Sequence, residues 1–156
     1  MMALRKIVSG GQTGVDRAAL DAAMESGVAV GGWCPRGGRA EDGPIPARYP
    51  LKETPEARYS QRTRWNVRDS DGTLILVKRT GPLSGGTALT AEIAEELGKP
   101  LYIAHIAEMP AVLPVAQWID AHAIAVLNVA GPRASQAESI YAQAADFMEA
   151  VLQACS

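Results

Sequence analysis

The fold is decided by the sequence Lys6-Ile7-Val8-Ser9-Gly10-Gly11-Gln12-Thr13-Gly14-Val15-Asp16-Arg17, a short apolar run that leads into a glycine-rich turn and a helix. Glycine has no Cβ, so this turn can bend sharply and bring its N–H groups close to a bound group. The helix that follows adds unpaired N–H groups and the positive end of its dipole, which favour phosphate. The spacing matches neither the P-loop nor G-x-G-x-x-G. We expect an anion-binding turn here, with a tight structural turn as the alternative.

Helix and strand patterns alternate along the rest of the chain. After the strand at 6–8, the sequence predicts strands at 28–33, 73–77, 101–104 and 124–129. Helices are predicted at 15–26, at 55–68, through Leu89, Ile93 and Leu97, at 114–122 and from Ser135 onward. Their starts are indicated by capping patterns: Thr13 with Asp16, Thr54 before Pro55, and Ser135 with Glu138. Residues 34–50 are rich in proline and glycine, and we expect an ordered functional loop or a lid.

This alternation predicts an α/β fold, a three-layer α/β/α sandwich around a mostly parallel five-stranded sheet. With the strands numbered along the chain, the expected order is 2-1-3-4-5. The strand at 73–77 is placed centrally because it is a continuous apolar run. Ligands bind beyond the carboxyl ends of such strands, where the strand order reverses. The glycine turns at 10–14 and 81–87 follow the first and third strands, so this order brings both turns to one crevice.

Length and composition restrict the kind of protein. A chain of 156 residues that is 47% hydrophobic is expected to form a single domain over residues 1–156. The net charge of −2 gives no reason to expect nucleic acid as a partner. Residues 34–70 nevertheless carry eight Lys or Arg and five Asp or Glu, a local basic excess. No apolar stretch approaches the ~20 residues of a membrane span. With two cysteines and no recognisable leader, we expect a cytoplasmic protein that does not bind membranes.

A phosphorylated small molecule is the expected ligand, held by the backbone of both glycine turns and by arginines of the basic segment. The candidate binding residues are Gly10, Gly11, Gln12, Thr13, Gly14, Arg17, Arg62, Thr63, Arg64, Asn66, Ser84, Gly85, Gly86, Thr87 and Asn128. For any single arginine, a solvated surface position is the simpler interpretation. A bulky residue at Gly11 is expected to abolish binding without unfolding the protein. No metal site is expected, because His105 and His122 lie in different segments and match no zinc spacing.

Several segments together carry a family resemblance: Ser9-Gly10-Gly11-Gln12-Thr13-Gly14-Val15-Asp16-Arg17-Ala18-Ala19-Leu20-Asp21, Gly31 to Pro35, Arg39 to Pro46, Arg62-Thr63 with Asn66-Val67, Ser70 to Ile75, Gly85-Gly86-Thr87, and Leu127 to Arg133. In these the chain resembles the molybdenum-cofactor carrier proteins, which are Rossmann-like. Their superfamily includes the LOG-type (lysine-decarboxylase-like) nucleotide phosphoribohydrolases and the DNA-processing A proteins. The resemblance implies a Rossmann-like domain that binds the molybdenum cofactor (molybdopterin), or else a nucleotide, as cargo. It also implies a homo-oligomer, either a dimer or a tetramer.

Carriage requires no catalytic residue, whereas the alternative function is catalytic. It is a nucleotide N-glycosidic hydrolase (phosphoribohydrolase) of the LOG type, with Glu92 or Asp16 as the acid or base. LOG-type enzymes carry P-G-G-x-G-T-x-x-E, but the turn at 84–92 lacks the proline and the third glycine and displaces the glutamate. A sensor of a nucleotide derivative is a third interpretation. We therefore expect a carrier protein rather than an enzyme.

Overall fold

A computed structural model of the protein describes residues 4–108 and 111–156. Its main sheet contains five strands: β1 (Lys6–Val8), β2 (Ala29–Gly31), β7 (Gly72–Val77), β8 (Leu101–His105) and β9 (Val126–Ala130). Every neighbouring pair of these strands is parallel, in the order β2-β1-β9-β7-β8. The expected parallel five-stranded sheet is confirmed.

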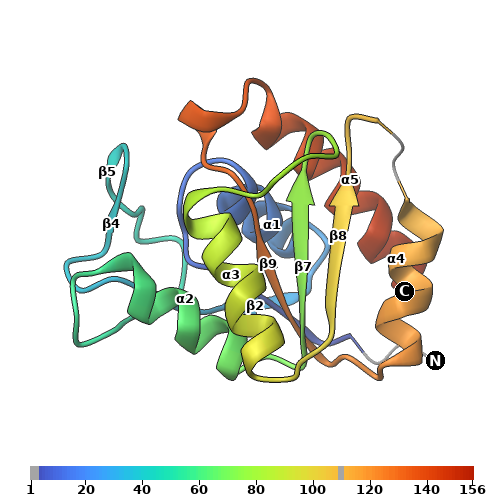
Figure 1. Ribbon diagram of the computed structural model, residues 1–156, viewed down its shortest axis with the longest axis horizontal. Coiled ribbons are helices and arrows are strands. Elements are labelled where there is room, and N and C mark those ends of the chain that lie inside the picture. The colour runs from blue at the N-terminus through green and yellow to red at the C-terminus, as the bar shows by residue number, and fades with distance from the viewer. Residues whose placement is uncertain (1–3, 109–110) are drawn as a thin grey trace.

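Helices cover both faces of the sheet (Figure 1). One layer contains α1 (Val15–Glu25), α4 (Val112–Ala121) and α5 (Ile140–Cys155), and the other contains α2 (Tyr59–Arg68) and α3 (Gly85–Glu96). Side chains alternate along a strand, so β7 contributes to both layers. Leu74 and Leu76 join the core beneath α1, α4 and α5, whereas Ile75 packs with Ala91 of α3. The α/β/α sandwich is thus built as the sequence predicts.

The position of the last strand differs from the expected order. β9 lies between β1 and β7, with Leu127 opposite Ile7 and Asn128 opposite Thr73. The two strands that carry the glycine turns are therefore not neighbours, and β9 rather than β7 is central. A side chain fixes this arrangement, because Asp71 Oδ2 accepts the N–H groups of Ala125 at 3.0 Å and Val126 at 2.9 Å. The Asp71 carboxylate thereby ties the start of β9 to the start of β7.

The predicted capping residues hold loops rather than helix ends. α2 begins at Tyr59 rather than at residue 55, and the Thr54 hydroxyl donates to the carbonyl oxygens of Cys34 (3.3 Å) and Glu56 (3.0 Å). The last helix begins at Ile140, after a short 3₁₀ turn η1 (Ala134–Gln136). For α1 the cap is Gly14, and no side chain of the described residues caps it, so the box that pairs Thr13 with Asp16 is not formed.

The segment between β2 and α2 makes two small sheets of its own. The strand predicted at 28–33 ends at Gly31, and β3 (Trp33–Cys34) pairs instead with β6 (Lys52–Glu53). β4 (Arg39–Ala40) and β5 (Gly43–Pro44) form an antiparallel hairpin at the side of the molecule, at the left in Figure 1. The described part of the chain contains no helix with the length and hydropathy to cross a bilayer.

Candidate functional site

A cavity of about 350 Å³ opens at the carboxyl end of the sheet. We call it the crevice. Four segments line it, namely the β1–α1 turn with the start of α1, α2, the first half of α3, and the end of β9 with the residues that follow it. Its volume lies in the range of roughly 300–1,000 Å³ that is typical of small-molecule sites, and its position is the one that α/β sheets use for ligands. Both glycine turns contribute to it.

The structure brings most of the candidate binding residues to the crevice. Those that line it are Gly10, Gln12, Arg62, Thr63, Asn66, Gly85, Gly86, Thr87 and Asn128, together with Asp16. The candidates outside its lining are Gly11, Thr13, Gly14, Arg17, Arg64, Ser84 and Glu92. Lining residues that we did not predict are Tyr59, Leu89, Thr90, Val129, Ala130, Gly131, Arg133 and Gln136. Tyr59 could have been predicted, because it lies one helical turn before Thr63 and therefore on the same face of α2.

The β1–α1 turn already holds an anion of the chain itself. The Gln12 N–H donates to Asp16 Oδ2 at 3.1 Å, and the Gly11 N–H donates to Ser9 Oγ at 3.4 Å. The Thr13 N–H donates to the side-chain carbonyl of Gln12 at 3.1 Å. These N–H groups therefore have partners within the turn, and our expectation that they bind an external phosphate is not supported by the geometry. The alternative of a tight structural turn describes this segment better.

Two glycines of this turn serve close packing. Gly11 has φ 76°, and a Cβ there would lie 2.5 Å from the Leu51 side chain, on the side of the 45–51 segment. Gly14 has φ 80°, and a Cβ there would lie 2.5 Å from the carbonyl oxygen of Pro132. A bulky residue at Gly11 would strain the backbone and displace the Leu51 side chain, so its effect on binding would come together with an effect on stability.

Asp16 is the buried charge of the site, with 7% of its surface exposed. Burial raises its pKa from 3.8 to about 6, because desolvation disfavours the ionised carboxyl. The positive charge of Arg62 and hydrogen bonds from the Gln12 and Gly10 backbone oppose that effect. Asp16 is thus the one predicted acid or base that lies at the crevice. Glu92 is exposed on α3 and does not line it.

The predicted arginines divide between the crevice and surface ion pairs. Arg62 lines the crevice, where its Nη1 donates to the Gly10 carbonyl at 2.8 Å and its guanidinium lies over the Tyr59 ring. Arg64 instead pairs with Glu96 at 2.6 Å. Beyond α2, the second positive group of the crevice is Arg133, which follows β9. Arg133 belongs to a segment that carries the family resemblance, Leu127 to Arg133, but it was not among the predicted site residues.

The first turn of α3 gives the crevice its N–H groups. Gly85, Gly86 and Thr87 line the crevice, and no side chain of the described residues caps the helix at Ser84. The first N–H groups of a helix have no partner within the helix, and the helix dipole is positive at this end. Ser84 itself lines a second, smaller cavity of about 180 Å³, which shares Thr87 and Gln136 with the crevice. This turn, rather than the β1–α1 turn, has the geometry of an anion site.

Three polar candidates that line the crevice have bonds within the fold. Asn66 accepts the Trp33 N–H at 2.8 Å and donates to the Trp33 carbonyl at 2.9 Å. The Thr63 hydroxyl donates to the Tyr59 carbonyl at 2.9 Å. Asn128 donates to the Thr73 hydroxyl at 3.3 Å and is 3% exposed. These side chains hold α2 and the strands in place, so their contribution to the crevice is mainly its shape.

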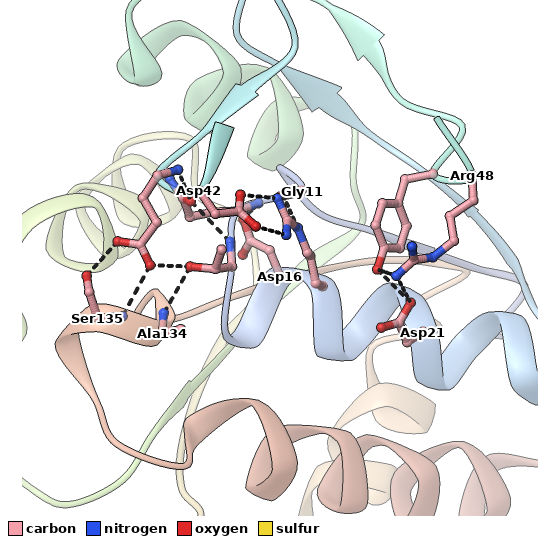
Figure 2. Close-up of polar contacts among 12 residues, drawn as sticks. Gly11, Asp16, Asp21, Asp42, Arg48, Ala134 and Ser135 are labelled. Atoms are coloured by element: carbon pink, nitrogen blue, oxygen red, sulfur yellow. Dashed lines mark hydrogen bonds and ion pairs between the residues drawn. The ribbon is translucent and has the colours of Figure 1, made fainter. Parts of the chain in front are cut away.

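The turn of the β4–β5 hairpin is fastened to the edge of the crevice (Figure 2). Arg17 pairs with both carboxylate oxygens of Asp42, at 2.6 and 2.8 Å, and this hydrogen bonding lowers the pKa of Asp42. Glu41 accepts hydrogen bonds from the hydroxyls of Ser135 and Thr13, which lower its pKa. Arg17 and Thr13, both predicted to hold a ligand, bond to this hairpin in the structure.

A solved structure closely matches the whole chain. It is the crystal structure of a protein from Syntrophus aciditrophicus SB named "Putative molybdenum carrier protein". The two chains are 45% identical and superpose with a TM-score of 0.90, over 97% of this chain and 96% of the other. Among curated proteins, no match was found.

A protein-family model also covers nearly the entire chain. The model describes a circularly permutated YpsA SLOG family and matches residues 7–152. A circular permutation moves an element from one end of the chain to the other while it keeps its place in the fold. The last strand of this chain, β9, indeed lies in the middle of the sheet, between β1 and β7. The chain therefore belongs to the circularly permutated YpsA SLOG family.

Proposed function

We propose that the protein is a molybdenum-cofactor carrier that binds a phosphorylated pterin or nucleotide-like molecule in the crevice and releases it unchanged. The observation that carries this proposal is the uncapped first turn of α3, which faces a cavity of about 350 Å³ in the described part of the structure. The 45% identical neighbour is named a molybdenum carrier protein, which is consistent with a cargo that contains molybdenum.

The phosphate is proposed to lie against Gly85, Gly86 and Thr87. Backbone N–H groups and the helix dipole stabilise an oxyanion at this position. Arg62 and Arg133 supply positive charge to the same cavity. The ring system of the ligand would occupy the rest of the crevice, where Tyr59 and Leu89 offer apolar surface.

Hydrolysis of a nucleotide is the second candidate, and one observation favours it. Asp16 lines the crevice, and burial raises its pKa to about 6, which suits proton transfer near neutral pH. Its Oδ2, however, accepts the Gln12 N–H, so part of its hydrogen-bonding capacity serves the turn. Incubation with nucleoside monophosphates followed by chromatography separates the two functions. Release of free base supports hydrolysis, and recovery of intact nucleotide supports carriage.

Gly86 is the most informative position at which to test the phosphate site. A Cβ at Gly86 would meet no atom within 4 Å, and the residue lies in the first turn of α3. Gly86→Asp therefore places a negative charge at the proposed phosphate position without a steric clash. An acidic residue at a helix N-terminus usually stabilises the helix, so the variant is expected to be at least as stable as the wild type. Gly86→Asn is the matched neutral control.

Titration calorimetry with inorganic phosphate, GMP and a pterin phosphate measures the outcome. Gly86→Asp is expected to weaken binding about tenfold or more, which corresponds to about 1.4 kcal/mol. Gly86→Asn is expected to bind nearly as the wild type does. Equal affinity in the wild type and Gly86→Asp would place the phosphate elsewhere. Mass spectrometry of the small molecule that copurifies with the wild type from its own cell would then identify the cargo.

A further inference from the structure

The carboxylate of Glu41 is surrounded by hydrogen-bond donors from two distant segments. Ser135 donates its hydroxyl at 2.5 Å and its backbone N–H at 3.2 Å. The Thr13 hydroxyl donates to Glu41 Oε2, the same oxygen that accepts the Ser135 N–H, and the Ala134 N–H donates to the Thr13 hydroxyl oxygen at 3.1 Å. The bond from Ala134 directs the Thr13 proton towards Glu41. Figure 2 shows these contacts between the hairpin and the residues after β9.

This set of donors is typical of an oxyanion site. Two hydroxyls, a backbone N–H and a guanidinium are groups that bind phosphate as well as carboxylate. The guanidinium belongs to Arg133, whose Nε lies 3.4 Å from Glu41 Oε1. In the structure, this position is occupied by an anion of the chain itself, the Glu41 carboxylate.

Arg133 adds a further observation on this site, although 40% of its side chain is exposed. Its Nε is buried, and among the described residues none accepts a hydrogen bond from it, although Glu41 is close enough for an ion pair. A buried donor without an acceptor is costly, because it has lost its water and gained no partner. The carboxylate of Glu41 therefore fills the position without satisfying all of its donors. A tetrahedral oxyanion has more acceptor oxygens and can reach this N–H as well.

The Glu41 position is continuous with the crevice. Arg133 lines the crevice and pairs with Glu41, and Gln12 lines the crevice while its side-chain carbonyl accepts the Glu41 N–H at 2.8 Å. An anionic group on a ligand in the crevice would meet Glu41 as a competitor. The hairpin that carries Glu41 has strands of only two residues each, so little backbone pairing holds it, and the Arg17–Asp42 ion pair is a further side-chain anchor at its turn.

We propose that Thr13, Arg133 and Ser135 form a second oxyanion site beside the crevice, that Glu41 occupies it as an internal competitor, and that an anionic group of the ligand displaces Glu41 and so removes one of the side-chain anchors of the β4–β5 hairpin. The proposal rests on the proposed function, because the same ligand supplies both anions. It specifies the ligand class as a molecule with two anionic groups, one at α3 and one at this site. Pyrophosphate is the simplest probe with two phosphoryl groups.

The variant Glu41→Gln tests the competition. It removes the competing charge and is expected to raise the affinity for pyrophosphate about fivefold or more, equivalent to a coupling of about 1 kcal/mol. If Glu41 only held its neighbours in position, Glu41→Gln would instead lower the affinity for pyrophosphate. Glu53→Gln is the charge-matched control. Glu53 lies in the same segment between β2 and α2, but its carboxylate accepts the Gly37 N–H and contacts none of the donors that surround Glu41. The control is expected to keep the wild-type affinity.

Hydrogen exchange on the unmodified protein gives a second measurement that does not depend on a variant. Saturating pyrophosphate is expected to speed exchange in residues 39–45, because the hairpin loses its contacts at Glu41 and keeps only the Arg17–Asp42 pair at its turn. Equal or weaker pyrophosphate binding by Glu41→Gln, or slower exchange of the hairpin, would overturn the proposal. If pyrophosphate binding is lost in Gly86→Asp but unchanged in Glu41→Gln, the crevice function stands and the competitor role of Glu41 falls.

Discussion

Replacement of Asp16 by asparagine tests the main electrostatic feature of the crevice. The folded protein raises the pKa of this carboxyl from 3.8 to about 6, chiefly through burial. The folded state therefore binds the proton more tightly than the unfolded state. The folded protein loses stability as the pH rises from about 4 to about 6, because the unfolded state ionises first. The difference between the two pKa values corresponds to about 3 kcal/mol. An asparagine side chain carries no charge, so Asp16→Asn avoids that cost at neutral pH while the amide carbonyl can still accept the Gln12 N–H.

Urea denaturation of both proteins between about pH 4 and about pH 7 gives the free energies to compare. At the acidic end the two proteins are expected to have similar stability, and at neutral pH Asp16→Asn is expected to be more stable by up to about 3 kcal/mol. Carboxyls with lowered pKa, such as Glu41 and Asp42, change stability in the opposite direction, but equally in both proteins. Parallel stability profiles would show that burial does not govern the ionisation of Asp16.

Two further substitutions test contacts that shape the site. Asn66→Ala is expected to lower the free energy of unfolding by about 2 to 4 kcal/mol, because the Trp33 N–H and carbonyl both lose their hydrogen-bond partner. Chemical denaturation measures this loss. A loss smaller than about 2 kcal/mol would show that water replaces the amide. Gly14→Ala is expected to lower the melting temperature more than Gly27→Ala does. Both glycines have positive φ, but a new Cβ at Gly14 would meet backbone atoms, among them the Pro132 carbonyl oxygen, whereas one at Gly27 would meet nothing within 4 Å. Equal melting temperatures of the two variants would contradict this.

The fold was predictable because its strands are short apolar runs separated by helix patterns. β7 shows this most clearly, since a run of six buried residues can only be an inner strand of a sheet covered on both faces. The strand order was not predictable from the same information. Neighbours in sequence are usually neighbours in the sheet, and that rule places the last strand at an edge. The hydrogen bonds between Asp71 and the start of β9 are long-range contacts, and no local sequence pattern predicts them.

The location of the site was predictable for a similar reason, whereas the roles of its residues were not. Glycine turns after parallel strands meet at one edge of the sheet, and this brought Gly10 and Gly85 to one crevice. Which turn has N–H groups to offer depends on tertiary partners. The β1–α1 turn has an acid two residues after its last glycine, and that acid, Asp16, accepts the Gln12 N–H. Arg17 likewise has a partner, Asp42, that lies far away in the sequence.

Two carboxylates of the chain therefore determine where an external anion can bind. Asp16 is buried and bonded within its own turn, so another anion cannot replace it without breaking that turn. Glu41 lies in the turn of a short hairpin, and its donors Thr13 and Ser135 belong to other segments, so the proposed displacement does not require them to move with it. An exchangeable anion position needs donors fixed by the fold and an occupant that can be released. The Glu41 position meets both conditions and the β1–α1 turn meets only the first, so the α3 turn and the Glu41 position are where phosphoryl groups should compete.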